Sequence, residues 1–266
     1  MKLNNLREIS YRVRKNVLQM AHNGKSSHVG SALSIVDILV TLYFGVFNND
    51  LIMKKNKLRD KFILSKGHAG SALYAILYEI GLISKEELFT HCKDNSRLSG
   101  HVSHLLPGIE ISTGSLGHGL SIGCGFALAK KMNNKKIDKK VYVLLSDGEC
   151  DEGSTWEAVL FASHHKLNNL ICLIDYNKLQ SLDKVKNTLN LEPFKSKWKS
   201  FGWDVVSVDG HNHNKIIKSL KVKKKPLCII CNTTKGKGVK FMQDKVLWHY
   251  RSPNKQELAK AIKSLK

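Results

Sequence analysis

Two polar segments of this sequence directly follow apolar runs. Asp147 and Gly148 come after VYVLLS, and Asn177 comes after the next such run, LICLIDY. If the runs are neighbouring parallel strands, Asp147 and Asn177 meet at one edge of the sheet. A carboxylate and an amide oxygen, with a backbone carbonyl and phosphate oxygens, form a site suited to Mg²⁺ or Ca²⁺, and Gly148 lets a diphosphate approach the backbone. The alternative is that Asp and Asn only cap the following helices. Spacing alone leaves both possibilities open.

The alternation of apolar segments predicts the elements that position these residues. VYVLLSD, LICLIDYN, WDVVSVDG and LCIICNTT alternate with helix-like segments at Gly153–His165, near Pro193–Phe201 and after Asn212. Such alternation is typical of a parallel sheet covered on both faces, and ligands of these sheets bind beyond the carboxyl ends of the strands. We therefore predict an α/β fold, a parallel twisted sheet with helices on both faces, with residues 1–266 as a single domain.

The remaining segments predict further elements. A short strand is expected at Lys61–Leu64, and Ser84 to Glu87 has the S-x-x-E form that opens a helix. Helices are also expected at Leu6–Met20, Ser34–Phe47, Ser71–Ile80, from the glycine-rich segment Gly114–Gly125 to about Met132, and at Asn254–Lys266.

The composition is that of a folded domain. The chain has 266 residues, of which 42% are hydrophobic, enough for one α/β domain with a full core. The polar N-terminus lacks the apolar core of a signal peptide, and no apolar run approaches the ~18–20 residues of a membrane helix. We expect a cytoplasmic protein that does not interact with membranes.

The net charge of +21 is the unusual feature of the composition. Basic runs such as KSLKVKKKP are usually solvated, but they can attract nucleic acid, an acidic partner or phosphorylated substrates. No nucleic-acid motif and no basic stripe interleaved with aromatic residues accompanies them, so nucleic acid is not expected as the main partner. Cys228 and Cys231 form a C-x-x-C inside an apparent strand, where their side chains point to opposite faces. We expect core cysteines there and not a redox pair.

Segments along the whole chain, in consistent order, resemble the diphosphate-binding (PP-type) domain of transketolases. Asp147, Gly148 and Asn177 resemble the thiamine-diphosphate motif, which begins G-D-G and ends in N, although Ser146 replaces its first glycine. The other matching segments are Ser26–Gly30 (S-G-H-x-G), Ser65–Ala69 (S-K-G-H-A), Gly100–His101 (G-H-P), Leu106–Glu110 (P-G-V-E), Ser112–Gly119 (T-G-S-L-G-Q-G), Val208–Asn212 (V-D-G-H-D), and Lys235–Val239 with Trp248–His249 (K-G-K-G-V…W-H).

The resemblance implies a bound thiamine diphosphate and a divalent metal, Mg²⁺ or Ca²⁺. Asp147, Asn177 and the backbone carbonyl of Leu179 are expected to ligate the metal. The residues expected at the cofactor are His68, Gly114, Leu116, Asp147, Gly148, Asn177, Lys235 and His249. For Lys235, an exposed lysine in a lysine-rich tail is the alternative.

Four of the 12 histidines lie in these motifs. The resemblance implies that His28, His68 and His101 line the channel to the reactive carbon of the cofactor and bind the hydroxyl groups of a donor ketose. His249 is expected at the cofactor diphosphate and the substrate carbonyl. A neutral histidine near pH 7 can donate or accept a proton, which suits these positions.

Glu152 and Glu157 are the other acids to which the resemblance assigns a catalytic role. At these positions it implies a hydrogen-bonded path across a subunit interface, between two active sites. As plain surface acids both residues are unremarkable.

The expected partner is a second chain. In full-length transketolases a pyrimidine-binding domain follows the segment matched here, and it supplies the glutamate that activates the cofactor. We expect a separate C-terminal transketolase-like subunit to carry it, in a heterotetramer of two αβ units.

The implied reaction is transfer of a two-carbon ketol unit from a ketose (phosphate) to an aldose (phosphate). The alternatives are another thiamine-diphosphate-dependent carboligation, in specialised sugar biosynthesis or like that of deoxyxylulose-phosphate synthase, and a non-catalytic basic binding protein on the same fold.

Overall fold

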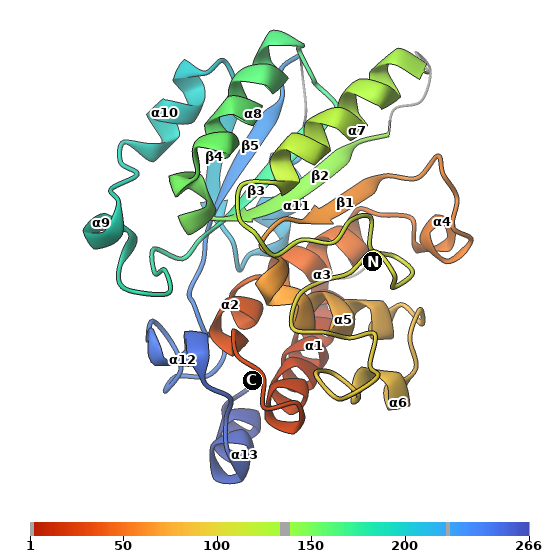
Figure 1. Cartoon of the computed structure of the whole chain (residues 1–266), viewed down its shortest axis with the longest axis vertical. Helices are drawn as coiled ribbons and strands as arrows, with labels where there is room; N and C mark the ends of the chain where they lie inside the picture. Colours follow the sequence, from red (N-terminus) through yellow and green to blue (C-terminus); the bar gives the residue numbers. More distant parts are fainter. Residues whose placement is uncertain (1–2, 134–138, 222–223, 266) are drawn as a thin grey trace.

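A parallel five-stranded sheet forms the centre of the molecule in the computed structural model, which describes residues 3–133, 139–221 and 224–265 (Figure 1). The strands lie in the order β1-β2-β3-β5-β4, and every neighbouring pair is parallel. The strands are β1 (Lys61–Leu64), β2 (Val141–Ser146), β3 (Leu170–Tyr176), β4 (Asp204–Asp209) and β5 (Leu227–Asn232). Their carboxyl ends therefore share one edge of the sheet.

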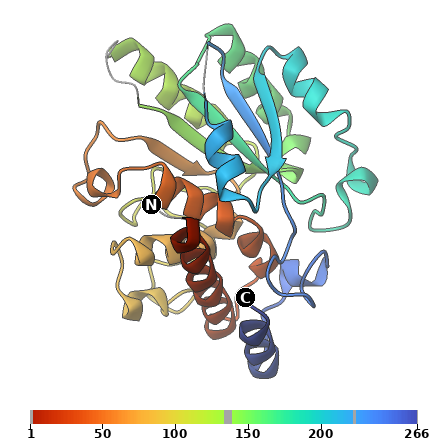
Figure 2. The ribbon, with the colours of Figure 1, turned by 180° about the vertical axis from the view of Figure 1, so that it is seen from behind.

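Helices cover both faces of the sheet, each over its own apolar core (Figures 1 and 2). Successive strand residues alternate between the cores, as Val143 and Leu144 of β2 do. One face is covered by α7 (Gly119–Asn133), α8 (Gly153–His164) and α10 (Phe194–Ser200). The other core contains residues of α1 (Leu3–Asn23), α2 (Val29–Ser34), α3 (Val36–Gly45), α5 (Gly70–Glu79) and α11 (His213–Ser219).

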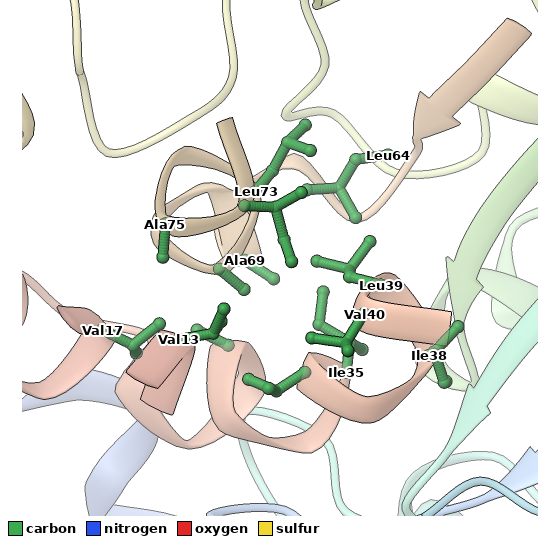
Figure 3. Close-up of a cluster of buried hydrophobic side chains, with 14 of the residues drawn as sticks. Val13, Val17, Ile35, Ile38, Leu39, Val40, Leu64, Ala69, Leu73 and Ala75 are labelled. Carbon is green, nitrogen blue, oxygen red and sulfur yellow. The ribbon is translucent and has the colours of Figure 1, made fainter. Parts of the chain in front are cut away.

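The second core continues beyond the sheet into a helical layer (Figure 3). Val13 of α1, Leu39 of α3 and Leu73 of α5 meet there, beside Leu64 at the end of β1. The end of β1, from which the segment with Lys66 and His68 leaves the sheet, therefore rests on closely packed apolar side chains.

Short elements complete the described chain. They are α4 (Asn49–Met53), η1 (Gly67–Ala69), α6 (Lys85–Leu88), η2 (Gly148–Asp151), α9 (Val185–Thr188), α12 (Leu247–Tyr250) and α13 (Lys255–Ser264). At α6 the Ser84 side chain accepts a hydrogen bond from the Glu87 amide, as its sequence predicts. None of the described helices has the length and apolar character needed to cross a bilayer.

The predicted sheet and its covering helices are confirmed, with one change in the helices. The segment Ser34–Phe47 was expected as one helix, but α2 ends at Ser34 and α3 begins at Val36. Every residue of α2 is buried, so the segment lacks the alternation of apolar and polar faces from which a helix boundary can be predicted. Cys228 and Cys231 are buried in opposite cores, as expected for core cysteines in a strand.

Candidate functional site

A cavity of about 240 Å³ opens at the carboxyl edge of the sheet. Sequence segments far apart in the chain meet there, because parallel strands release their following loops at the same edge. The predicted residues that line the cavity are His28, His68, His101, Gly114, Leu116, Asp147, Gly148, Asn177, Leu179, Lys235 and His249. Lining residues that the sequence analysis did not single out as site residues are Ser31, Lys66, Ser146, Gln180 and Ser181.

The four motif histidines form one cluster in this cavity. The ring centroid of His28 lies 5.1 Å from that of His68, 5.8 Å from that of His101 and 4.8 Å from that of His249. His28 has a left-handed backbone (φ 69°), and its amide donates to the carbonyl of His249 over 2.7 Å. A non-glycine residue held in this region stores strain, which often accompanies functional positions.

Neighbouring side chains orient three of the four rings by hydrogen bonds. The Ser27 hydroxyl lies 2.8 Å from Nδ1 of His28, and the Ser31 hydroxyl lies 2.9 Å from Nε2 of His68. The Lys235 ammonium lies 3.0 Å from Nδ1 of His249. Because an ammonium only donates, Nδ1 of His249 acts as the acceptor, which leaves Nε2 as the proton-bearing nitrogen of the neutral ring.

Burial keeps His28, His68 and His249 neutral. It lowers the pKa of His28 to about 4 and that of His249 to about 3, with a further contribution from neighbouring cationic groups, including Lys235. The pKa of His68 is also lowered, again mainly by burial. At neutral pH the cavity therefore offers neutral imidazoles that can donate and accept hydrogen bonds.

The lowered pKa values predict acid sensitivity. We expect the unfolding temperature of the cofactor-free chain to fall between pH 6.5 and about 4, because the unfolded chain takes up protons that buried His28 excludes. His28→Gln should make this decrease smaller. Circular dichroism melts across this pH range measure it, with His118→Gln, which replaces an exposed histidine, as the matched control. Equal slopes for both variants contradict the prediction.

Asp147 and Asn177 lie at the ends of β2 and β3, where the sequence predicted them. Asp147 is 2% exposed, and its two oxygens accept hydrogen bonds from the amides of Gly148 (2.8 Å) and Lys178 (2.6 Å). Burial, reinforced by the nearby Asp175, raises the pKa of Asp147 to about 6. Burial and Asp175 thus disfavour the negative charge of Asp147, and a bound cation would offset this effect. The site therefore favours a positively charged ligand beside the carboxylate.

The donor set fits a hard cation. A carboxylate, the Asn177 amide and the Leu179 carbonyl contribute oxygen to one cavity, and oxygen is the ligand type that Mg²⁺ and Ca²⁺ prefer. The Leu179 carbonyl accepts from the Lys235 ammonium over 3.0 Å, and its second lone pair stays available. Lys235 is buried, so it is not the exposed lysine of the alternative interpretation.

The loop with Gly114 and Leu116 is attached to the end of β2 through Glu149. This fully buried carboxylate accepts hydrogen bonds from the Gly117 amide (3.0 Å) and the Ser65 hydroxyl. The hydroxyl of Ser146, which replaces the motif glycine, accepts from the Glu149 amide over 3.2 Å. The replacement therefore contributes to the local hydrogen bonding.

Glu152 and Glu157 lie outside the cavity. Both are exposed, and Glu157 borders a groove of about 300 Å³ between α7 and α8, together with Phe161. The structure thus separates these two acids from the histidine cluster. Their expected role at a subunit interface stays a prediction.

Sequence reasoning missed two buried charges at the cavity, Lys66 in its lining and Asp175 next to Asn177. They form an ion pair with a nitrogen–oxygen distance of 2.5 Å. The available signal was the charge of Asp175 inside the apolar run LICLIDY, since an acid in a buried strand requires a partner.

This fold and cavity define an α/β domain suited to binding an anionic cofactor at its strand ends, and comparisons with known proteins specify the class. The family described as "Transketolase, thiamine diphosphate binding domain" matches residues 7–265. The chain therefore belongs to the transketolase family, as a thiamine-diphosphate-binding domain.

Individual relatives agree with this membership. An apulose-4-phosphate transketolase subunit of Phocaeicola vulgatus is 40% identical over 256 residues, which cover 95% of this chain and 90% of that protein. The 6-deoxy-6-sulfo-D-fructose transketolase subunit SqwG of a Clostridium species is 40% identical over 89% of this chain and 87% of that protein. The crystal structure of Campylobacter jejuni transketolase superposes with a TM-score of 0.91 at 31% identity, over 99% of this chain and 43% of that one.

Proposed function

We propose that this chain is the diphosphate- and metal-binding subunit of a two-chain enzyme that transfers a two-carbon ketol unit from a ketose phosphate to an aldose phosphate. The observation that carries the proposal is the convergence of four histidines, Asp147 and Asn177 on one cavity of a transketolase-family domain. The named activities of the relatives support this class of substrate.

The cavity floor is the proposed cofactor and metal site. Asp147, Asn177 and the Leu179 carbonyl hold Mg²⁺, or Ca²⁺, against the cofactor diphosphate. Thiamine diphosphate, when bound, supplies the carbanion chemistry of ketol transfer. The residues proposed to hold it are His68, Gly114, Leu116, Gly148, Lys235 and His249, all of which line the cavity.

The histidines are the proposed catalytic groups. His28, His68 and His101 bind the hydroxyls and carbonyl oxygen of the sugar, and His249 binds near the cofactor diphosphate and the substrate carbonyl. Neutral rings suit this task, because they can donate to an oxygen as it becomes negative and accept from a hydroxyl. The lowered pKa values of His28 and His249 keep them neutral at the pH of ketol transfer.

The remaining half of the active site is proposed to come from a C-terminal transketolase-like subunit with the pyrimidine-binding domain. The chain spans 43% of the Campylobacter jejuni transketolase, whereas it spans 90% of the Phocaeicola vulgatus relative, which is named as one subunit of a transketolase. A two-chain organisation accounts for both proportions.

The proposed contact between two αβ units is the α7–α8 face. Leu160 is 59% exposed and Phe161 is 40% exposed on this face, next to Glu157. Gly125 lies inside α7 with open space where a side chain would be. A glycine costs a helix interior about 0.5–1 kcal/mol relative to alanine, so its presence favours close approach of another chain.

The test is to isolate the tagged chain from its own cells with Mg²⁺ and thiamine diphosphate, and to determine the mass of the intact complex. We expect a second chain, bound cofactor and ketol transfer between sugar phosphates. A cofactor-free chain overturns the proposal, and steeply salt-dependent nucleic-acid binding would instead favour a non-catalytic basic protein.

Phe161→Glu is expected to convert a heterotetramer into single αβ units, because it buries a charge in the proposed contact. Native mass spectrometry of the reconstituted complex should show the mass halved. Ile217→Glu, an exposed apolar position on α11 across the sheet, is the matched control and should leave the tetramer intact. An unchanged mass for Phe161→Glu removes this face as the contact.

A further inference from the structure

The Lys66–Asp175 ion pair lies beside Asn177, one of the proposed metal ligands. Lys66 follows β1, Asp175 belongs to β3, and both side chains are 0% exposed. Lys66 lines the cavity, and its ammonium also donates to the Ser31 carbonyl over 3.3 Å. The pair therefore joins two strand ends at the point where the cavity begins.

Asp175 collects hydrogen bonds from several elements. Its Oδ2 accepts from Lys66, from the Ser34 hydroxyl (2.6 Å) and from the Asn177 side-chain amide (2.9 Å). Its Oδ1 accepts from the Thr233 hydroxyl after β5. Burial alone raises the pKa of Asp175, but the Lys66 ammonium and the hydroxyl donors bring it below the ordinary value, so the group is a carboxylate.

A carboxylate can only accept, and this determines how the Asn177 amide faces. Its nitrogen must point to Asp175, so its oxygen points the other way. That oxygen accepts one hydrogen bond, from the Leu179 amide over 3.1 Å, and retains a second lone pair. If Asp175 were absent, the amide would lose the acceptor on its nitrogen side, and the Leu179 N–H alone would oppose a half-turn that presents the NH₂ group to the cation.

Stability alone does not account for the pair. A buried ion pair contributes, as a rule, no more than well-packed apolar side chains of similar volume, while loss of one partner is strongly destabilising. The position of the pair, with one hydrogen bond to a proposed metal ligand, points to a role in the site.

We propose that Lys66 and Asp175 are positioning residues, which hold the Asn177 amide with its oxygen toward the metal. Lys66 keeps the carboxylate in place, and Asp175 selects the amide orientation. The inference rests on the proposed function, in which Asn177 ligates the metal. It concerns residues beside the ligands and not the ligands themselves.

The decisive variant is Lys66→Met combined with Asp175→Leu. The single variants are expected to lower the unfolding temperature strongly, because each leaves one buried charge. The double variant removes both charges and should recover most of that loss. Its Kd for Mg²⁺, measured by calorimetry with saturating thiamine diphosphate in the two-chain complex, should remain about 10–100-fold weaker than wild type.

If the pair is purely structural, the double variant regains both its stability and its wild-type Kd for Mg²⁺. That result overturns the inference. If the double variant is insoluble, Lys66→Met with Asp175→Asn keeps the side-chain shape and should weaken Mg²⁺ binding at least threefold. An unchanged Kd in that variant also overturns it.

A second buried ion pair supplies the control. Arg14 and Asp37 form an ion pair with a nitrogen–oxygen distance of 2.5 Å, and neither residue lines the cavity. Arg14→Met should lower the unfolding temperature and leave the Kd for Mg²⁺ unchanged at a temperature where the protein is folded. Absence of Mg²⁺-dependent cofactor binding in the wild-type complex contradicts the proposed function itself, which separates that failure from failure of the inference.

Discussion

Asp147→Asn is expected to weaken Mg²⁺-dependent binding of thiamine diphosphate by at least about 100-fold, more than the 10–100-fold typical of residues that only support a metal ligand. Asp147 is the one charged oxygen donor in the proposed ligand set. Each of its two oxygens also accepts a hydrogen bond from a backbone amide. An asparagine at this position must therefore place its NH₂ group against one of these N–H donors. Calorimetry of the two-chain complex measures the loss.

The control for Asp147→Asn is Asp183→Asn, an exposed acid outside the cavity, which should leave binding unchanged. The unfolding temperature of both variants must be recorded, because the new NH₂ group also disturbs the loop after β2. Wild-type affinity in Asp147→Asn excludes this residue as a metal ligand.

His101→Ala is expected to lower turnover by about 10²–10⁴-fold and to change the Kd for thiamine diphosphate by less than about threefold. His101 is the most exposed ring of the cluster, and within the described part of the chain its ring forms no hydrogen bond. It is therefore available to a sugar that enters the cavity. Steady-state kinetics of ketol transfer and cofactor titration give the two quantities.

His104→Ala is the matched control, since His104 is exposed, lies three residues along the same loop and bonds to Ser112 instead of facing the cavity. It should leave both turnover and cofactor affinity near the wild-type values. Equal losses of turnover and affinity in His101→Ala would show that the ring supports the cofactor and not the substrate.

Much of the site was predictable because a parallel sheet converts chain order into position. Once VYVLLSD and LICLIDYN are neighbouring parallel strands, Asp147 and Asn177 must follow them at the same edge. The glycine-containing motifs around His28, His68 and His101 carried the remaining predictions, through their resemblance to transketolases. Only the resemblance grouped these histidines in one channel, because no local pattern shows that distant segments of the chain meet at one cavity.

The helix break at Ile35 shows where sequence patterns lose information. Both α2 and α3 are almost entirely buried, so apolar residues occur on all sides and the 3.6-residue period disappears. The role of Glu152 and Glu157 is also not encoded in a local pattern. Both residues are exposed in this chain, and their exposure does not show which surface another subunit covers.

Local periodicity and chain direction were enough to predict the succession of strands and helices along the chain and the edge of the sheet at which the site forms, while the choice of ligands rested on the family resemblance. The folded chain was needed to show that Lys66 and Asp175, 109 residues apart, form a buried ion pair. It was also needed to show that the buried histidines of the cluster are neutral. Both properties depend on removal from water by distant segments, and lysine and histidine carry no local mark of burial.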